Sequence, residues 1–149
     1  MKVLLCRAGT RLCGLPLERV IETLRPLPVE TVPVPSKVVD GLAIVRGEPV
    51  PVLDLGRLLG GVDGLERTRW VTLQIESRVV AVAVDEVLGV RQLDKRSLVE
   101  LPPLLKHADS ELIETVGRLD AALLLVLGSG YLVPEEVRPA LASAEGAAR

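Results

Sequence analysis

Short runs of branched aliphatic residues, each ended by a turn-forming residue, place the strongest limit on how this chain can fold. Residues 3–8, 50–53 and 79–84 are rich in Val and Leu, and a Gly or an Asp follows each of them. Runs of this length and composition predict β-strands. Because many such runs follow one another closely and few stretches have helical periodicity, the sequence predicts an all-β protein, built as a small barrel or sandwich.

The core of this protein has to be built almost entirely from aliphatic side chains. Apolar residues make up 48% of the 149 residues, but Trp70 and Tyr131 are the whole aromatic content. A chain of this length buries roughly 70% of its unfolded surface. Val, Leu, Ile and Ala must therefore fill that interior, which suits packed sheets better than a ligand pocket lined by aromatic rings.

The first two strands are expected to form a hairpin, residues 3–8 and 11–17, about a two-residue turn at Gly9 and Thr10. That turn fixes the register and places Cys6 directly opposite Cys13. The two thiols are interpreted as small core hydrophobes. A redox pair is the alternative.

Further elements are predicted from the same patterns. Four prolines between residues 26 and 35 predict an extended crossing, because proline cannot donate to a strand ladder. Other strands are expected at 20–24, 42–45, 50–53, 70–75, 79–84, 87–93, 115–119 and 123–127, a turn at 46–49, and short helices at 55–59, 94–98 and 134–142.

A sequence pattern that occurs twice, called the internal echo below, predicts that the chain folds into two similar halves. Residues 15–20 and 82–87 share the order apolar, small, apolar, acidic, charged, valine. We expect one domain over residues 1–142, made of two pseudo-repeated subdomains that divide near 60–66, and a frayed tail at 143–149.

Charge and composition argue against several classes of function. The formal net charge is -2 and the pI is near 5.5, which does not favour nucleic-acid binding. No apolar run approaches the roughly 20 residues that span a bilayer, and no signal peptide is evident, so a cytoplasmic protein that is not membrane-inserted is expected. His107 is the single histidine, and no metal site, cofactor or catalytic set is predicted.

Three stretches carry a resemblance to a known family: residues 15–22, 41–55 and 84–90. In the second, an Arg-Gly turn lies between two apolar strands and Pro-Val-Leu-Asp-Leu follows. The order and spacing of the three stretches resemble the CheW family over essentially the whole chain. The resemblance implies two intertwined SH3-like five-stranded barrel subdomains around a shared apolar core, with short helices.

The resemblance also implies a function: a non-catalytic adaptor in bacterial chemotaxis-type signal transduction. One surface would bind the regulatory domain of a CheA-type histidine kinase, and a groove between the subdomains would bind the cytoplasmic tip of a chemoreceptor. By position, the residues matched to receptor contacts are Val20, Glu22, Arg46 and Val87. Turn or structural roles are expected for Gly41, Gly47, Asp54 and Asp85, with Asp54 as a helix cap and Asp85 tightening a local turn.

Three alternatives remain beside this interpretation, and the first is a purely structural pair of SH3-like subdomains that binds some other peptide. Ile44 stands where the family commonly has Asn, which leaves open a divergent CheW-like scaffold in a non-chemotaxis two-component pathway. Asp54, Leu55 and Gly56 are similar to the Asp-Thr-Gly loop of aspartic proteases. That chemistry needs two carboxylates sharing a proton, and Leu55 lacks the hydroxyl that braces such a loop.

Overall fold

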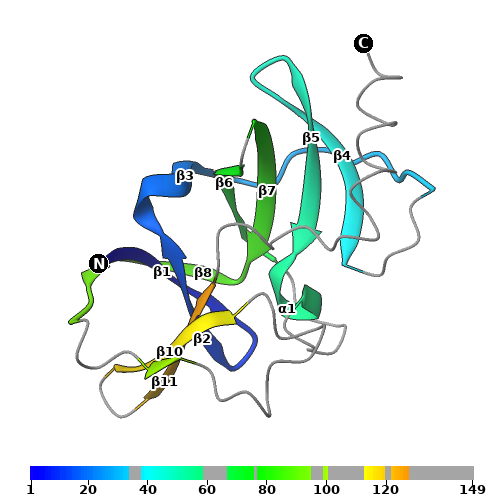
Figure 1. Cartoon of the computed structure of the whole chain (residues 1–149). Helices are drawn as coiled ribbons and strands as arrows, with labels where there is room; N and C mark the ends of the chain where they lie inside the picture. The colour runs from blue at the N-terminus through cyan, green and yellow to red at the C-terminus, as the bar shows by residue number, and fades with distance from the viewer. Residues whose placement is uncertain are drawn as a thin grey trace.

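The computed structural model describes residues 1–33, 38–58, 67–75, 77–94, 99–100, 113–119 and 122–127 (Figure 1). Within these residues nearly every element is a strand. In chain order they are β1 (Lys2–Ala8), β2 (Arg11–Pro16), the 3-10 turn η1 (Leu17–Arg19), β3 (Val20–Leu24), β4 (Val39–Val45), β5 (Glu48–Asp54), α1 (Leu55–Leu58), β6 (Arg69–Ile75), β7 (Arg78–Val84), β8 (Glu86–Gln92), β9 (Val99–Glu100), β10 (Ile113–Leu119) and β11 (Ala122–Leu127). The prediction of an all-β protein is confirmed.

The strands form two sheets with the same pairing pattern. The six-stranded sheet has the order β8-β1-β2-β11-β10-β9, and the five-stranded sheet has the order β3-β6-β7-β5-β4. Each contains one parallel pair, β11 with β2 and β5 with β7, while all other pairs are antiparallel. The sequence echo falls at corresponding places, since residues 15–20 lead from β2 into β3 and residues 82–87 lead from β7 into β8.

The two sheets are intertwined along the chain. A continuous stretch, β3 to β7, forms the five-stranded sheet, whereas the six-stranded sheet takes β1 and β2 from before it and β8 to β11 from after it. The chain therefore changes sheets twice, at η1 and at Asp85. The subdomain divide expected near residues 60–66 lies outside the described residues.

The β1–β2 hairpin has the predicted register. Cys6 lies opposite Cys13, and Gly9 has a φ of +64°, as a tight two-residue turn requires. Both thiols are free and fully buried. Burial raises the pKa of each to about 12. Such thiols pack as hydrophobes, because nearly no thiolate is present at neutral pH.

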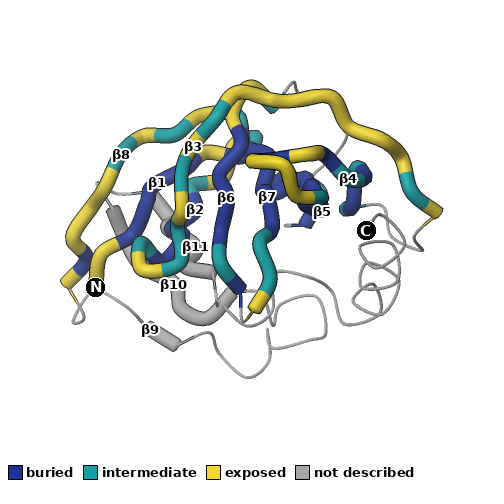
Figure 2. Tube along the Cα trace, turned by 90° about the horizontal axis from the view of Figure 1, so that it is seen from above, coloured by how far each residue is buried: buried dark blue, intermediate teal, exposed yellow. Residues whose placement is uncertain are grey.

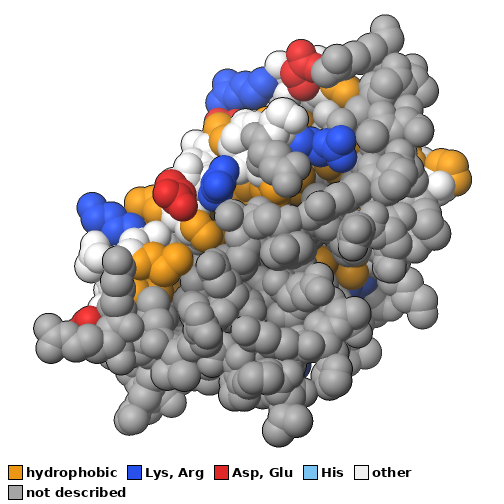
Figure 3. All heavy atoms as spheres, in the orientation of Figure 1, with side chains coloured by type: hydrophobic (Ala, Val, Ile, Leu, Met, Phe, Trp, Pro, Cys, Tyr) orange, Lys and Arg blue, Asp and Glu red, His pale blue; other side chains and the backbone are white. Residues whose placement is uncertain are grey.

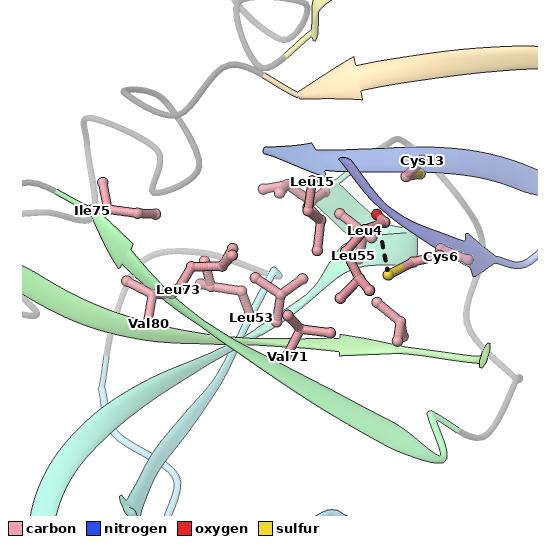
Figure 4. Packing of buried hydrophobic residues seen from close by; sticks show 14 of the residues in the cluster. Leu4, Cys6, Cys13, Leu15, Leu53, Leu55, Val71, Leu73, Ile75 and Val80 are labelled. Atoms are coloured by element: carbon pink, nitrogen blue, oxygen red, sulfur yellow. Dashed lines mark hydrogen bonds between the residues drawn. The ribbon is translucent and has the colours of Figure 1, made fainter. Parts of the chain in front are cut away.

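One aliphatic core lies between the sheets. Leu4 and Leu15 of the six-stranded sheet pack in the same cluster as Leu53, Leu73 and Val80 of the five-stranded sheet (Figure 4). All five are at most 6% exposed. The shared apolar core is thus confirmed, and neither sheet could bury its inner face without the other.

The single tryptophan has its own cluster on the five-stranded sheet. Trp70 is 3% exposed and lies with Ala43, Ala81 and Ala83, small residues that leave room for the indole. Figure 2 shows the contrast between the buried central strands β6 and β7 and the largely exposed edge strand β8.

The turn predicted at residues 46–49 is shorter in the structure. Arg46 and Gly47 form it alone, and Glu48 and Pro49 already belong to β5. Proline is tolerated there because β7 pairs with β5 only from Val52 onwards, so Pro49 has no neighbouring strand on its β7 side.

Several predicted features lie outside the described residues. They are the helices at 94–98 (apart from Asp94) and 134–142, His107 and the tail at 143–149. No helix among the described residues is long and apolar enough to span a bilayer.

Candidate partner-binding surface

The β4–β5 turn displays Arg46 in a left-handed conformation. Arg46 has a φ of +55° and Gly47 a φ of +80°. Two consecutive positive φ values are typical of the type I′ turn, whose twist matches that of the flanking strands. Gly47 adopts this conformation freely, whereas Arg46 does so at a cost in backbone energy. The Arg46 side chain is 79% exposed, so solvent or a partner can reach it.

Arg46 forms a two-pronged ion pair with Glu22 of β3. Its Nε donates to Oε1 at 3.1 Å and its Nη2 donates to Oε2 at 2.6 Å. These hydrogen bonds hold the pKa of Glu22 below its usual range. β3 and β4 are the two edges of the five-stranded sheet, so the pair links edges that have no ladder between them. An exposed ion pair contributes little to stability, and its main effect is to orient both side chains.

Val20 and Val87 occupy equivalent positions on the edge strands of different sheets. Val20 begins β3 opposite Leu73, and Val87 lies in β8 opposite Cys6. Both are half-buried and pack against the shared core cluster. The structure therefore brings Glu22 and Arg46 together and sets Val20 and Val87 against one core, while their role in receptor binding stays a prediction.

Several exposed aliphatic side chains were not singled out as contact residues in the sequence, and four of them are half-exposed or nearly so. Ile21 is 50% exposed, Leu88 40%, Val90 53% and Ile44 63%. Ile21 and Leu88 directly follow Val20 and Val87, so the internal echo was a usable signal for them. Figure 3 shows one face of the molecule, where hydrophobic side chains lie among basic and acidic ones. Such a mixture of apolar and charged groups is typical of a protein-binding surface.

Asp54 is the N-cap of α1, as predicted. Its Oδ1 accepts a hydrogen bond from the backbone N–H of Arg57 at 3.0 Å, and its side chain is 9% exposed. The same oxygen accepts a second bond from Arg67 Nε at 3.2 Å. An arginine that holds the carboxylate in place is the opposite of a protease dyad, in which two carboxylates share a proton.

Asp85 acts at longer range than the predicted local turn. Its Oδ2 accepts a hydrogen bond from the backbone N–H of Gly9 at 2.6 Å, and its Oδ1 pairs with Arg67 Nη1. Arg67 was missed by the sequence analysis. Burial opposes its charge, but the hydrogen bonds to Asp85 and Asp54 outweigh that cost and raise its pKa.

Gly41 is required by a close backbone approach. It has a φ of +147°, and a Cβ built there would lie 2.0 Å from the carbonyl oxygen of Glu30. Glu30 and Leu42 exchange two backbone hydrogen bonds of 2.8 Å at this point. Gly41 therefore lets the extended crossing dock on β4.

Over the ranges that the structure describes, no group of three or more His, Cys, Asp or Glu residues is placed to hold a metal ion.

Comparison with known proteins agrees with this architecture of two intertwined β-sheets. The family model described as "CheW-like domain" matches residues 2–136, and the chain belongs to that family. Protein FrzA of Myxococcus xanthus is 33% identical over 125 residues, which cover 80% of this chain and 78% of FrzA.

A solved structure has the same fold. The crystal structure of the scaffolding protein TtCheW from Thermoanaerobacter tengcongensis superposes with a TM-score of 0.79 at 22% identity, over 88% of this chain and 90% of that one. The chain is thus a CheW-like domain with an SH3-like barrel fold. Membership of this family of adaptors fits a chain without catalysis.

Proposed function

We propose that this chain is a cytoplasmic coupling adaptor that binds the regulatory domain of a CheA-type histidine kinase and the helical cytoplasmic tip of a chemoreceptor. The family supports the adaptor class. The observation that carries the receptor assignment is the exposed Glu22–Arg46 pair, which presents a fixed charge of each sign beside apolar side chains.

The chemistry of the surface fits a helical partner. A helix docks through apolar anchors in a groove, and charges at the rim set its register. Val20 and Val87 supply the apolar floor, while Ile21 and Leu88 present exposed apolar side chains on the opposite face of the same strands. The Glu22–Arg46 pair supplies the rim. Kinase binding uses a separate surface in this proposal.

The test is charge reversal at Arg46. Arg46→Glu should weaken binding of a purified receptor tip, and the loss should shrink as salt is added, because rim charges act over about a Debye length. The fold should persist, since an exposed turn side chain contributes little to stability. Kinase binding, measured separately by calorimetry, should change much less.

The chain offers two matched variants for this assay. Arg11→Glu makes the same charge change at an exposed position of the β1–β2 hairpin and should leave receptor binding intact. Adding Glu22→Arg to Arg46→Glu restores the ion pair with its polarity reversed, and this double variant should keep the fold but not recover the affinity. Unchanged receptor binding by Arg46→Glu at low salt would refute the assignment.

Ile44 favours a second candidate, a CheW-like scaffold in a two-component pathway other than chemotaxis. Its side chain is 63% exposed on β4, two residues from Arg46, where the family resemblance leads one to expect Asn. An exposed aliphatic residue suits a partner with a matching apolar patch. If Ile44→Asn strengthens binding to a chemoreceptor tip, this candidate gains support, and if it weakens that binding the first proposal does.

A further inference from the structure

Arg67 lies where the two sheets meet, just before β6. Its side chain is 9% exposed and carries a full charge, which a protein interior tolerates only when the charge is paired and hydrogen-bonded. Arg67 meets this requirement with two carboxylates, Asp54 through Nε and Asp85 through Nη1.

The two carboxylates are anchored on different parts of the fold. Asp54 ends β5, caps α1 and donates its backbone N–H to the carbonyl of Val38 at 2.8 Å, so it belongs to the five-stranded sheet. Asp85 is held by the β1–β2 hairpin, since its N–H donates to the Arg7 carbonyl at 2.9 Å and its Oδ2 accepts from Gly9 N–H at 2.6 Å. Arg67 thereby links the hairpin of one sheet to the corner of the other.

The space for this link is provided by a glycine. A Cβ on Gly56 would lie 1.8 Å from Nη2 and 2.8 Å from Cζ of Arg67, and its φ is not in the left-handed region. Backbone conformation therefore does not require glycine at this helical position, whereas the guanidinium does. The Arg67 side chain is thus accommodated by the absence of a Cβ at Gly56 and by the two carboxylates that pair with it.

We propose that Arg67 is a positioning residue that locks the β1–β2 hairpin of the six-stranded sheet onto the five-stranded sheet. It does so by fixing the Asp85 carboxylate toward Gly9 N–H. The two sheets carry Val87 and Val20 on their respective edge strands, so the lock also sets the spacing of the proposed binding floor. That last consequence rests on the proposed function, whereas the lock itself does not.

Amide hydrogen exchange of the isolated protein tests the lock. In Arg67→Met the exchange rate of Gly9 N–H should rise by about tenfold or more, because Arg67 no longer holds the accepting Asp85 carboxylate in place. The amide of Val82, in the middle of β7, should rise much less. A purely structural loss of stability would instead raise the Val82 rate at least as much as the Gly9 rate.

Gly56→Ala provides the second variant. It keeps every charge and mainly displaces the Arg67 guanidinium, while Asp54 Oδ1, 3.2 Å from the new Cβ, has to shift by much less. It should raise Gly9 exchange in the same selective way. Because it leaves no buried carboxylate without its arginine, it should fold even if Arg67→Met does not. Arg7→Met is the control: it removes a guanidinium two residues from Gly9 that pairs at 2.5 Å with the exposed Glu86, and it should leave Gly9 exchange unchanged.

A rise at Gly9 that is no larger than the rise at Val82 in both variants, or no rise at Gly9, overturns the lock. Because exchange is measured without a partner, that failure leaves the proposed function untouched. The proposed function fails separately, through unchanged receptor binding by Arg46→Glu.

Discussion

Replacing Gly41 with alanine should cost far more than replacing Gly47, although both glycines have positive φ. At Gly41 the added Cβ would meet the backbone carbonyl of Glu30 at 2.0 Å, and backbone cannot swing aside as a side-chain tip does. At Gly47 the Cβ would meet nothing within 4 Å. The pair of variants separates the cost of conformation from the cost of collision.

The magnitudes follow from the contacts. A residue other than glycine in such a rare conformation costs about 1–3 kcal/mol. Moving Glu30 away also breaks its two hydrogen bonds with Leu42, each with a net contribution of about 1 kcal/mol. Gly41→Ala should thus lower the free energy of unfolding by about 3–5 kcal/mol, a large share of the roughly 5–15 kcal/mol typical of a domain. Gly47→Ala should cost about 1 kcal/mol, the left-handed penalty alone.

Urea unfolding followed by Trp70 fluorescence measures both changes, since Trp70 is buried in the five-stranded sheet. The dependence of the unfolding free energy on urea concentration should be the same in the two variants, so that a shift in the midpoint urea concentration measures the change in stability. Equal losses for Gly41→Ala and Gly47→Ala would refute the collision argument and with it the docking of the crossing on β4.

Three further outcomes are expected. With thiol pKa values of about 12, Cys6 and Cys13 should resist alkylation at pH 8 in the native protein and react once denaturant is added; Cys13→Ala should cost about 2 kcal/mol of unfolding free energy. The pKa of Glu22 is lowered by Arg46, so the ion pair stabilises the folded protein at pH values above the ordinary pKa of Glu, and this stabilisation is lost as the pH falls through the lowered pKa. In an NMR titration of the Glu22 carboxyl carbon, Arg46→Met should therefore move the inflection to higher pH. Burial and a neighbouring carboxylate raise the pKa of Asp40, so its ionised form is disfavoured in the fold, and Asp40→Asn should raise unfolding free energy more at pH 7 than at pH 4.

The sequence predicted the local elements well because their causes are local. Two residues in a tight turn fix a register, which is why Cys6 could be placed opposite Cys13. A carboxylate before a short apolar helix caps it, which is why Asp54 was interpreted correctly. The turn at residues 46–49 was drawn too wide, since Glu48 and Pro49 already belong to β5 and Pro49 lies where β7 does not pair with that strand.

Long-range polar contacts could not be predicted in the same way. Glu22 and Arg46 were named by family resemblance, but that they pair depends on how the edges of the five-stranded sheet approach each other. Arg67 lies in a run of charged and polar residues, which has the composition of a solvated loop. Its burial between Asp54 and Asp85 follows from where the chain changes sheets, and no periodic pattern encodes that.

The order of the strands along the chain has a consequence for synthesis. When residues up to Val84 have left the ribosome, every strand of the five-stranded sheet is present, but the other sheet has only its first hairpin. Lys2 finds its partner Gln92 only 90 residues later, and loops that long close slowly. Until then the hairpin that carries Leu4 and Leu15 lacks the other strands of its sheet, β8 to β11. Nascent chains stalled before β8 should therefore be the form of this protein most prone to aggregate and most in need of a chaperone.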